Sequence, residues 1–99
     1  MLDIKCNAEN GKVCVALDGR LDTVTSPDLE KQLTEALVDA TELVMDFEKL
    51  EYISSAGLRV LLAAQKTMNK QGEMKLTKVN DTIMGIFEVT GFSEILTIE

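Results

Sequence analysis

Strand-like and helix-like segments alternate along this chain, and that alternation limits its fold more than any other feature. Asn10-Gly11 is typical of a two-residue hairpin turn, which favours residues that accept a left-handed backbone. Apolar runs of strand length then alternate with amphipathic segments of helical spacing. We predict strands at 4–6, 12–17, 42–47, 75–79 and 95–98, and helices that start at Ser26, Ser55 and Asp81. The pattern predicts an α/β fold with right-handed crossovers, in which helices cover a mixed sheet of four to five strands.

The ends of the predicted helices carry recognisable signals. Ser26 suits an N-cap and Pro27 suits the first helical position, because the N–H that proline lacks would be unpaired there anyway. Asp81 is predicted to cap the third helix, and Gly72 and Gly91 are predicted to close the second and third helices.

Two segments around the predicted strands complete the expected fold. Residues 20–25, between the second strand and the first helix, are predicted to form a loop after Asp18-Gly19. Residues 43–45 are continuously apolar, which is typical of a strand that is covered on both faces.

Length and net charge limit the classes of protein to which this chain can belong. A chain of 99 residues predicts a single domain, 1–99, and its hydrophobic content of 45% is enough for one core. The net charge of −7 argues against binding to nucleic acid or to an anionic membrane surface. No apolar run is long enough to insert into a membrane, and the N-terminus lacks the pattern of a signal peptide, so we expect a cytoplasmic protein.

The two cysteines and the absence of histidine limit the kinds of bonding and catalytic site that the chain can form. In the predicted hairpin Cys6 lies opposite Val15 and Cys14 lies opposite Asn7, so the two thiols point to opposite faces and are expected to stay free in a reducing compartment. The chain has no histidine, which removes most zinc sites and the Ser-His-Asp triad. We expect no metal, no cofactor and no enzymatic activity.

Three polar residues are predicted to meet where the parallel strands end and the helices begin: Asp22, Asp46 and Ser55. Ser55 has two interpretations, a helix N-cap or a serine that accepts a phosphate. Gly57 favours the second, because glycine in the first helical turn costs up to about 1 kcal/mol relative to alanine and leaves the hydroxyl unshielded. The three residues also allow a small-molecule or nucleotide-binding domain, although no phosphate-binding glycine motif supports it.

Three segments of the chain together resemble the STAS domain of bacterial anti-sigma factor antagonists: 17–22, 43–47 and 52–61. The resemblance implies a protein that binds an anti-sigma factor, itself a serine kinase, and so releases a sigma factor for transcription. It also implies that the kinase phosphorylates one serine to stop this binding, and that a metal-dependent serine phosphatase reverses the modification.

The resemblance also assigns the site. The Ser-x-Gly-Leu block places the phosphorylated residue at Ser55. Many members have an aspartate just before this serine, whereas this chain has Ser54, which adds a second hydroxyl and makes Ser54 the second choice. Asp22 matches the acidic residue that lies near that serine. Leu21 and Val24 supply either apolar contact area or core, and Arg59 either contacts the partner or forms a surface ion pair. The expected contact residues are Leu21, Asp22, Thr23, Val24, Ser54, Ser55, Ala56, Gly57, Leu58 and Arg59. A cytoplasmic STAS subunit of a transporter is the alternative role.

Overall fold

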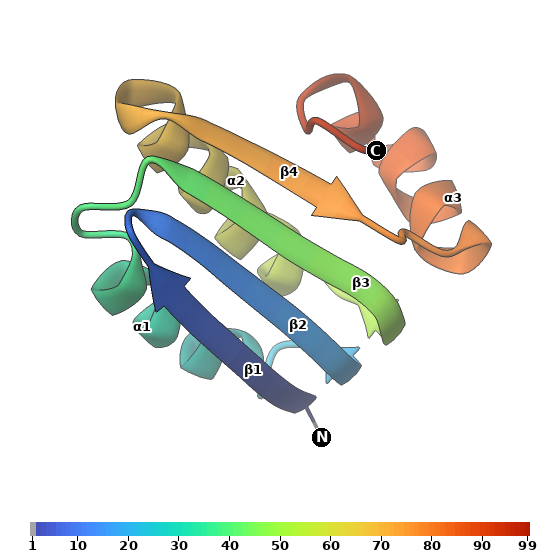
Figure 1. The fold of residues 1–99 in the computed structure, drawn as a ribbon. Coiled ribbons are helices and arrows are strands. Elements are labelled where there is room, and N and C mark those ends of the chain that lie inside the picture. Colours follow the sequence, from blue (N-terminus) through green and yellow to red (C-terminus); the bar gives the residue numbers. More distant parts are fainter. Residues whose placement is uncertain (1) are drawn as a thin grey trace.

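The computed structural model describes residues 2–99, and four strands form one mixed sheet in it. The order across the sheet is β1 (Leu2–Glu9), β2 (Lys12–Leu21), β3 (Glu42–Ile53) and β4 (Glu73–Thr77). β1 runs antiparallel to β2, whereas β2, β3 and β4 are parallel to one another (Figure 1). The prediction of a small α/β domain with a mixed sheet is confirmed.

The hairpin between β1 and β2 forms as predicted. Asn10 and Gly11 both have positive φ angles, 52° and 84°, as a turn of this kind requires. The register places Cys6 opposite Val15 and Cys14 opposite Asn7, and both cysteines are free and exposed. β1 is longer than predicted because its charged residues lie on the face of the sheet that helices do not cover.

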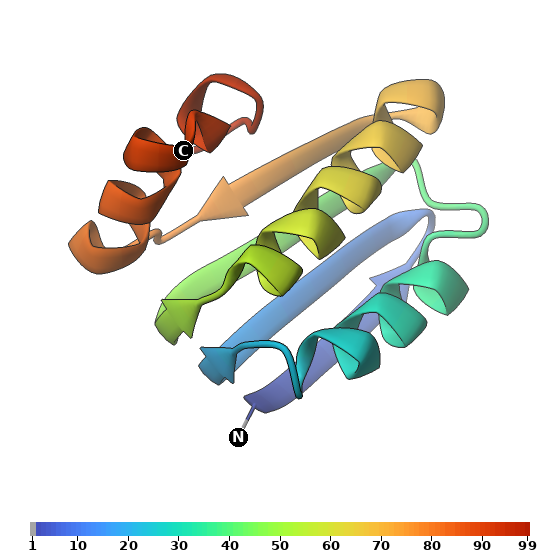
Figure 2. The ribbon, with the colours of Figure 1, turned by 180° about the vertical axis from the view of Figure 1, so that it is seen from behind.

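Both crossover helices lie on the same face of the sheet (Figure 2). α1 (Ser26–Ala36) joins β2 to β3, and α2 (Ser55–Gln71) joins β3 to β4. Because the strands follow chain order across the sheet, two right-handed crossovers must place their helices on one side. The opposite face stays open, and Val44 on that face is only half-buried. The prediction that residues 43–45 are covered on both sides is therefore wrong.

The core fills the space between the sheet and the two helices. Its strand residues are Val13, Val15, Leu17, Leu21, Leu43, Met45, Phe47, Leu50, Ile53, Met74 and Leu76. Gly72 closes α2 as predicted, and its N–H donates to the carbonyl of Met68 at 2.7 Å. A side chain is impossible there, because a Cβ on Gly72 would lie 1.9 Å from the carbonyl oxygen of Thr41.

α3 (Asp81–Thr90) and the short 3₁₀ helix η1 (Phe92–Glu94) lie beyond β4 (Figure 1). Asn80, and not Asp81, caps α3: its side chain accepts from the N–H of Ile83 at 3.0 Å and donates to the carbonyl of Leu50 at 2.8 Å. Gly91 ends α3 with a φ of 81°, as predicted.

The predicted fifth strand, 95–98, is reduced to a single bridge between Leu76 and Ile98. Two hydrogen bonds hold it, one from the N–H of Leu76 to the carbonyl of Thr97 and one from the N–H of Glu99 to the carbonyl of Leu76, both 2.9 Å. The N–H groups of Ile95 and Leu96 donate instead to the carbonyl of Phe92, so the first half of the predicted strand forms the exit from η1.

Candidate regulatory site at the start of helix α2

The ends of β2 and β3 bring two predicted site segments together. β2 continues to Leu21, inside the predicted loop 20–25, and β3 continues to Ile53, beyond the predicted strand end at residue 47. These two residues are paired. The N–H of Ser54 donates to the carbonyl of Leu21 at 2.9 Å. Asp22 and the Ser54-Ser55 pair therefore follow the ends of neighbouring parallel strands and lie side by side.

The loop after β2 is organised by the carboxylate of Asp22. It accepts hydrogen bonds from the N–H groups of Val24 and Thr25, both at 3.0 Å, and from the Thr25 hydroxyl at 3.2 Å. The bond from the Thr25 N–H lowers the pKa of Asp22 most, and with the others it outweighs the raising effect of desolvation. The pKa lies below the ordinary value of 3.8, so this carboxylate is ionised at neutral pH.

Ser26 is not the N-cap of α1, as we had predicted. It is the first residue of the helix, it is buried, and its hydroxyl donates to the carbonyl of Asp22 at 2.5 Å. Thr25 precedes the helix without a side-chain cap, and its hydroxyl donates to the carbonyl of Arg20 at 2.8 Å. Both hydroxyls therefore fix the loop onto the end of β2.

The two adjacent serines have different surroundings. Ser54 is the N-cap of α2, with extended backbone angles, and its side chain accepts from the N–H of Gly57 at 3.4 Å. Ser55 is the first helical residue and is exposed, and its hydroxyl makes no hydrogen bond to any of residues 2–99. The capping role thus belongs to Ser54, which leaves the Ser55 hydroxyl open to solvent.

Gly57 is required for packing. A Cβ at this position would lie 2.8 Å from Cγ of Leu21 and 2.9 Å from Cγ1 of Ile53, which is closer than real contacts allow. The absence of a side chain lets the first turn of α2 approach the ends of β2 and β3. Our interpretation that Gly57 serves to unshield the hydroxyl is corrected accordingly.

The expected contact residues divide into exposed and buried ones. Leu21 is 0% exposed and Leu58 is 7% exposed, and Gly57 is buried between strand and helix, so these three belong to the core and we remove them from the contact set. Val24 is 82% exposed. We call the remaining residues the switch surface: Asp22, Thr23, Val24, Ser54, Ser55, Ala56 and Arg59.

Arg20 and Tyr52 are neighbours of the switch surface that we did not predict from the sequence. They are directly paired across β2 and β3, and the Arg20 guanidinium lies 4.5 Å from the centre of the Tyr52 ring. Such a cation–π contact is worth about 0.5–1 kcal/mol at an exposed site. Arg20 lies in the predicted loop 20–25 and Tyr52 lies beyond the predicted strand 42–47, so only the correct strand bounds would have paired them.

Asp46 does not join the site, contrary to our prediction. It lies between Ala16 and Thr77 in the middle of the sheet, so about 23 Å of extended strand separates it from Ile53. Its carboxylate accepts from the N–H of Glu48 at 2.9 Å and pairs with Lys78 at 3.7 Å. Within residues 2–99 no group of three His, Cys, Asp or Glu side chains could hold a metal ion.

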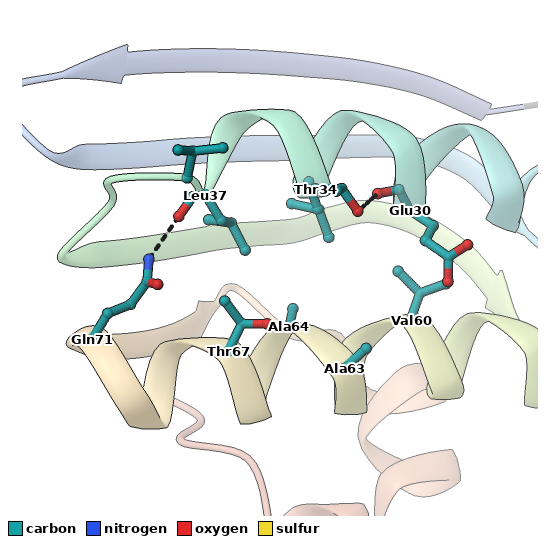
Figure 3. Close-up of a pocket in the computed structure, with 10 residues that line it drawn as sticks. Glu30, Thr34, Leu37, Val60, Ala63, Ala64, Thr67 and Gln71 are labelled. Carbon is teal, nitrogen blue, oxygen red and sulfur yellow. Dashed lines mark hydrogen bonds between the residues drawn. The ribbon is translucent and has the colours of Figure 1, made fainter.

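A hollow of about 240 Å³ lies between α1 and α2, away from Ser55. Val60, Ala63, Ala64 and Thr67 of α2 face α1 across it, and Gln71 closes one end by donating to the carbonyls of Leu37 and Ala40, both at 2.6 Å (Figure 3). In the part of the chain that is described, no helix is long and apolar enough to cross a membrane.

The fold and the site define a class: a small α/β domain whose sheet carries its crossover helices on one face and which presents an exposed serine hydroxyl at the start of a helix. Residues 3–99 match the STAS domain model, and the chain belongs to the STAS domain family. It is 36% identical over 92 residues to the candidate anti-sigma factor antagonist BtrV of Bordetella bronchiseptica, covering 90% of this chain and 78% of that protein.

Three further comparisons agree. The chain is 30% identical over 97 residues to an anti-sigma-B factor antagonist of Staphylococcus aureus, covering 96% of this chain and 90% of the relative. An anti-sigma factor antagonist from Mycobacterium paratuberculosis has the same fold, with a TM-score of 0.88 at 22% identity over 99% of this chain and 85% of that one. The unphosphorylated form of SpoIIAA matches with a TM-score of 0.77 at 17% identity, over 98% of this chain and 87% of that one.

Proposed function

We propose that this protein is an anti-sigma factor antagonist that is switched by phosphorylation of Ser55. Its unphosphorylated form binds an anti-sigma factor with serine kinase activity, and this binding frees a sigma factor. The observation that carries the proposal is the division of labour at the start of α2, where Ser54 caps the helix and the exposed Ser55 hydroxyl has no structural partner. The role of the relatives, which are named anti-sigma factor antagonists, supports it.

The size of the effect follows from electrostatics. A phosphate on Ser55 adds a charge of about −1.5 to −2 at pH 7. In the free protein the N-terminus of α2 stabilises this charge by about 0.3–1 kcal/mol. In a complex the same phosphate would lose water against the partner, and an unpaired buried charge costs several kcal/mol. A loss of about 4 kcal/mol weakens binding about a thousandfold, so charge alone is enough to release the partner.

The proposed switch does not need a change of fold. SpoIIAA has been solved in an unphosphorylated and a phosphorylated form, and both match this chain with a TM-score of 0.77. The likeness of both forms to this chain supports a domain that keeps its architecture in both states. We infer that the phosphate acts locally, on the switch surface.

The cycle needs a second partner, a metal-dependent serine phosphatase that restores the hydroxyl. The exposure of Ser55 suits this exchange, since kinase and phosphatase must both reach the same oxygen. The protein itself acts as substrate and ligand in this scheme, and it catalyses no step. The free thiols of Cys6 and Cys14 fit a reducing cytoplasm.

The test uses a purified anti-sigma kinase from the same genome, with ATP and Mg²⁺. Mass spectrometry is expected to place the phosphate on Ser55 in the wild type and in Ser54→Ala, and to find none in Ser55→Ala. Isothermal titration is expected to show tight binding by Ser55→Ala and a loss of about a thousandfold for Ser55→Asp. Phosphate on Ser54, or unchanged affinity of Ser55→Asp, would contradict the switch.

Two outcomes would favour the other roles of this chain. Capture of membrane transporter components from native extract, with no anti-sigma kinase, would favour a transporter subunit. A thermal shift with nucleotides that disappears in Ser55→Ala would favour a ligand-binding domain.

A further inference from the structure

We propose that the protein forms a homodimer in which the β1 strands of two copies pair antiparallel about a two-fold axis at Ile4. The inference stands independently of the proposed function, because it uses none of the switch surface. The two edges of the sheet differ. The C-terminal segment bridges β4 through Leu76 and Ile98, whereas no segment among residues 2–99 pairs with the outer side of β1 (Figure 1).

β1 has the features of an edge that can accept another strand. It pairs with β2 in an unbroken register from Leu2 to Glu9, and it contains neither a bulge nor a proline. In an antiparallel pair, every second residue directs its N–H and C=O groups to the partner strand. The residues of β1 between these direct their N–H and C=O groups outward, away from β2. An outer strand of this length is therefore a template for pairing.

The side chains of this edge are incompletely covered by α1. Leu2 and Ile4 point to the helix-bearing face and are only half-buried, and Cys6 on the same face is exposed. A hollow of about 340 Å³ lies beside them, between β1 and α1, and is lined by Leu2, Asp3, Ile4, Asp28, Lys31, Gln32 and Glu35. A second β1 strand would bring apolar side chains to this uncovered row.

Charge selects a second copy of this chain as the occupant. With the axis at Ile4, Asp3 of each copy lies opposite Lys5 of the other, and Leu2 lies opposite Cys6. Within its own chain Asp3 lies opposite Asp18, an unfavourable pair of like charges, and Lys5 lies opposite Ala16. The second copy thus supplies the opposite charge that each of these residues lacks across its own hairpin.

Other symmetric registers are less favourable. An axis at Lys5 sets that residue against itself, and an axis at Cys6 sets Asp3 against Glu9, which are both pairs of like charge. An axis at Asn7 sets Lys5 against Glu9, but its apolar pairs contain only Cys6 and Ala8. Only the axis at Ile4 combines opposite charges with the two largest apolar side chains of β1.

Cysteine cross-linking tests both the dimer and its register. Both native cysteines of the full chain are first replaced, by Cys6→Ser and Cys14→Ser. One variant then carries Ile4→Cys, and the matched control carries Asn7→Cys. Directly opposed Cα atoms in antiparallel strands lie about 5.5 Å apart, within the range of a disulfide. On oxidation we expect Ile4→Cys to form a disulfide-linked dimer, detected on a non-reducing gel. The rate of its formation is expected to be at least about tenfold that of Asn7→Cys.

Sedimentation of the unmodified full chain provides the second arm. We expect a monomer–dimer equilibrium that strengthens with added salt, because each copy carries a net charge of −7. Lys5→Glu is expected to weaken dimerisation about tenfold, and Asp3→Lys with Lys5→Glu to restore it. A monomer at every concentration up to about 1 mM, or equal cross-linking of Asn7→Cys, would overturn the proposal.

Discussion

Ser54 and Ser55 are neighbours in sequence, but only Ser54 supports the fold. Its side chain accepts the N–H of Gly57, whereas Ser55 has no such contact with the described residues. We predict that Ser54→Ala lowers the free energy of unfolding by about 1 kcal/mol, the usual value of a serine cap. Ser55→Ala is expected to change it by less than about 0.5 kcal/mol. Urea denaturation of both variants measures the difference, and equal losses would refute this division of roles.

Asp22 is predicted to make stability depend on acid pH. Its pKa is lowered in the folded protein, chiefly by the Thr25 N–H, so the ionised form stabilises the fold above the ordinary value of 3.8. This contribution is lost as the pH falls through the lower, folded-state pKa. Asp22→Asn keeps an oxygen for the N–H groups of Val24 and Thr25 but cannot titrate. Melting temperatures between neutral and strongly acid pH should fall less steeply for this variant than for the wild type.

Arg59 is predicted to pair with a phosphate on Ser55. The two positions are one helical turn apart, with the acid on the N-terminal side, which is the favourable order for such pairs. In phosphorylated protein, Arg59→Gln should raise the second pKa of the phosphate, ordinarily about 6, as read by ³¹P nuclear magnetic resonance. Arg20→Gln is the matched control, because Arg20 stacks on Tyr52 instead. An equal shift in both variants would argue against a specific pair.

The contact of α2 with the ends of β2 and β3 depends on Gly57. We predict that Gly57→Ala destabilises the protein by about 1–3 kcal/mol, because its Cβ would overlap Leu21 and Ile53. Gly85 in α3 gives the opposite sign: a Cβ there meets nothing within 4 Å, so Gly85→Ala should stabilise by up to about 1 kcal/mol. Chemical denaturation measures the free energy of unfolding of both variants, and opposite signs relative to the wild type are expected.

Element order was predictable from the sequence, whereas strand ends were not. The hairpin and both crossover helices follow from turn, cap and periodicity signals that act locally. The extensions of β2 and β3 do not. β2 keeps its alternation of buried and exposed residues to Leu21, but Asp18-Gly19 resembles a turn. In β3 the buried residues beyond Phe47 are Leu50 and Ile53, at every third position, where the register with β2 shifts. The pairing of Leu21 with Ile53 is a tertiary contact with no local signal.

The candidate site was predictable only in part, because it depends on the strand order, which was predicted, and on the strand ends, which were not. Asp22 and Ser55 were expected at adjacent strand ends, and they lie there. Asp46 was misplaced because the predicted third strand ended at residue 47, whereas β3 continues to Ile53. The capping role depends on which serine has extended backbone angles, and local helix-start signals alone do not distinguish Ser54 from Ser55.

The molecule as a whole should tolerate phosphorylation without rearrangement. The modified oxygen faces solvent and the sheet is held by a continuous core, so the helix N-terminus receives the charge without repacking. We predict that Ser55 phosphorylation shifts the melting temperature by less than about 5 °C. Amide chemical shifts should change around the switch surface and stay constant in β1 and β4. Shifts spread across the sheet would instead indicate a global conformational change.

Gly57 lets α2 pack against Leu21 and Ile53, whereas under the proposed function the exposed hydroxyl of Ser55, two positions earlier, controls partner binding. A natural variant of this chain that keeps the glycine but has alanine in place of Ser55 should fold normally and stay permanently competent for its partner. Genome surveys can therefore separate responsive antagonists from constitutive ones by inspecting these two positions together.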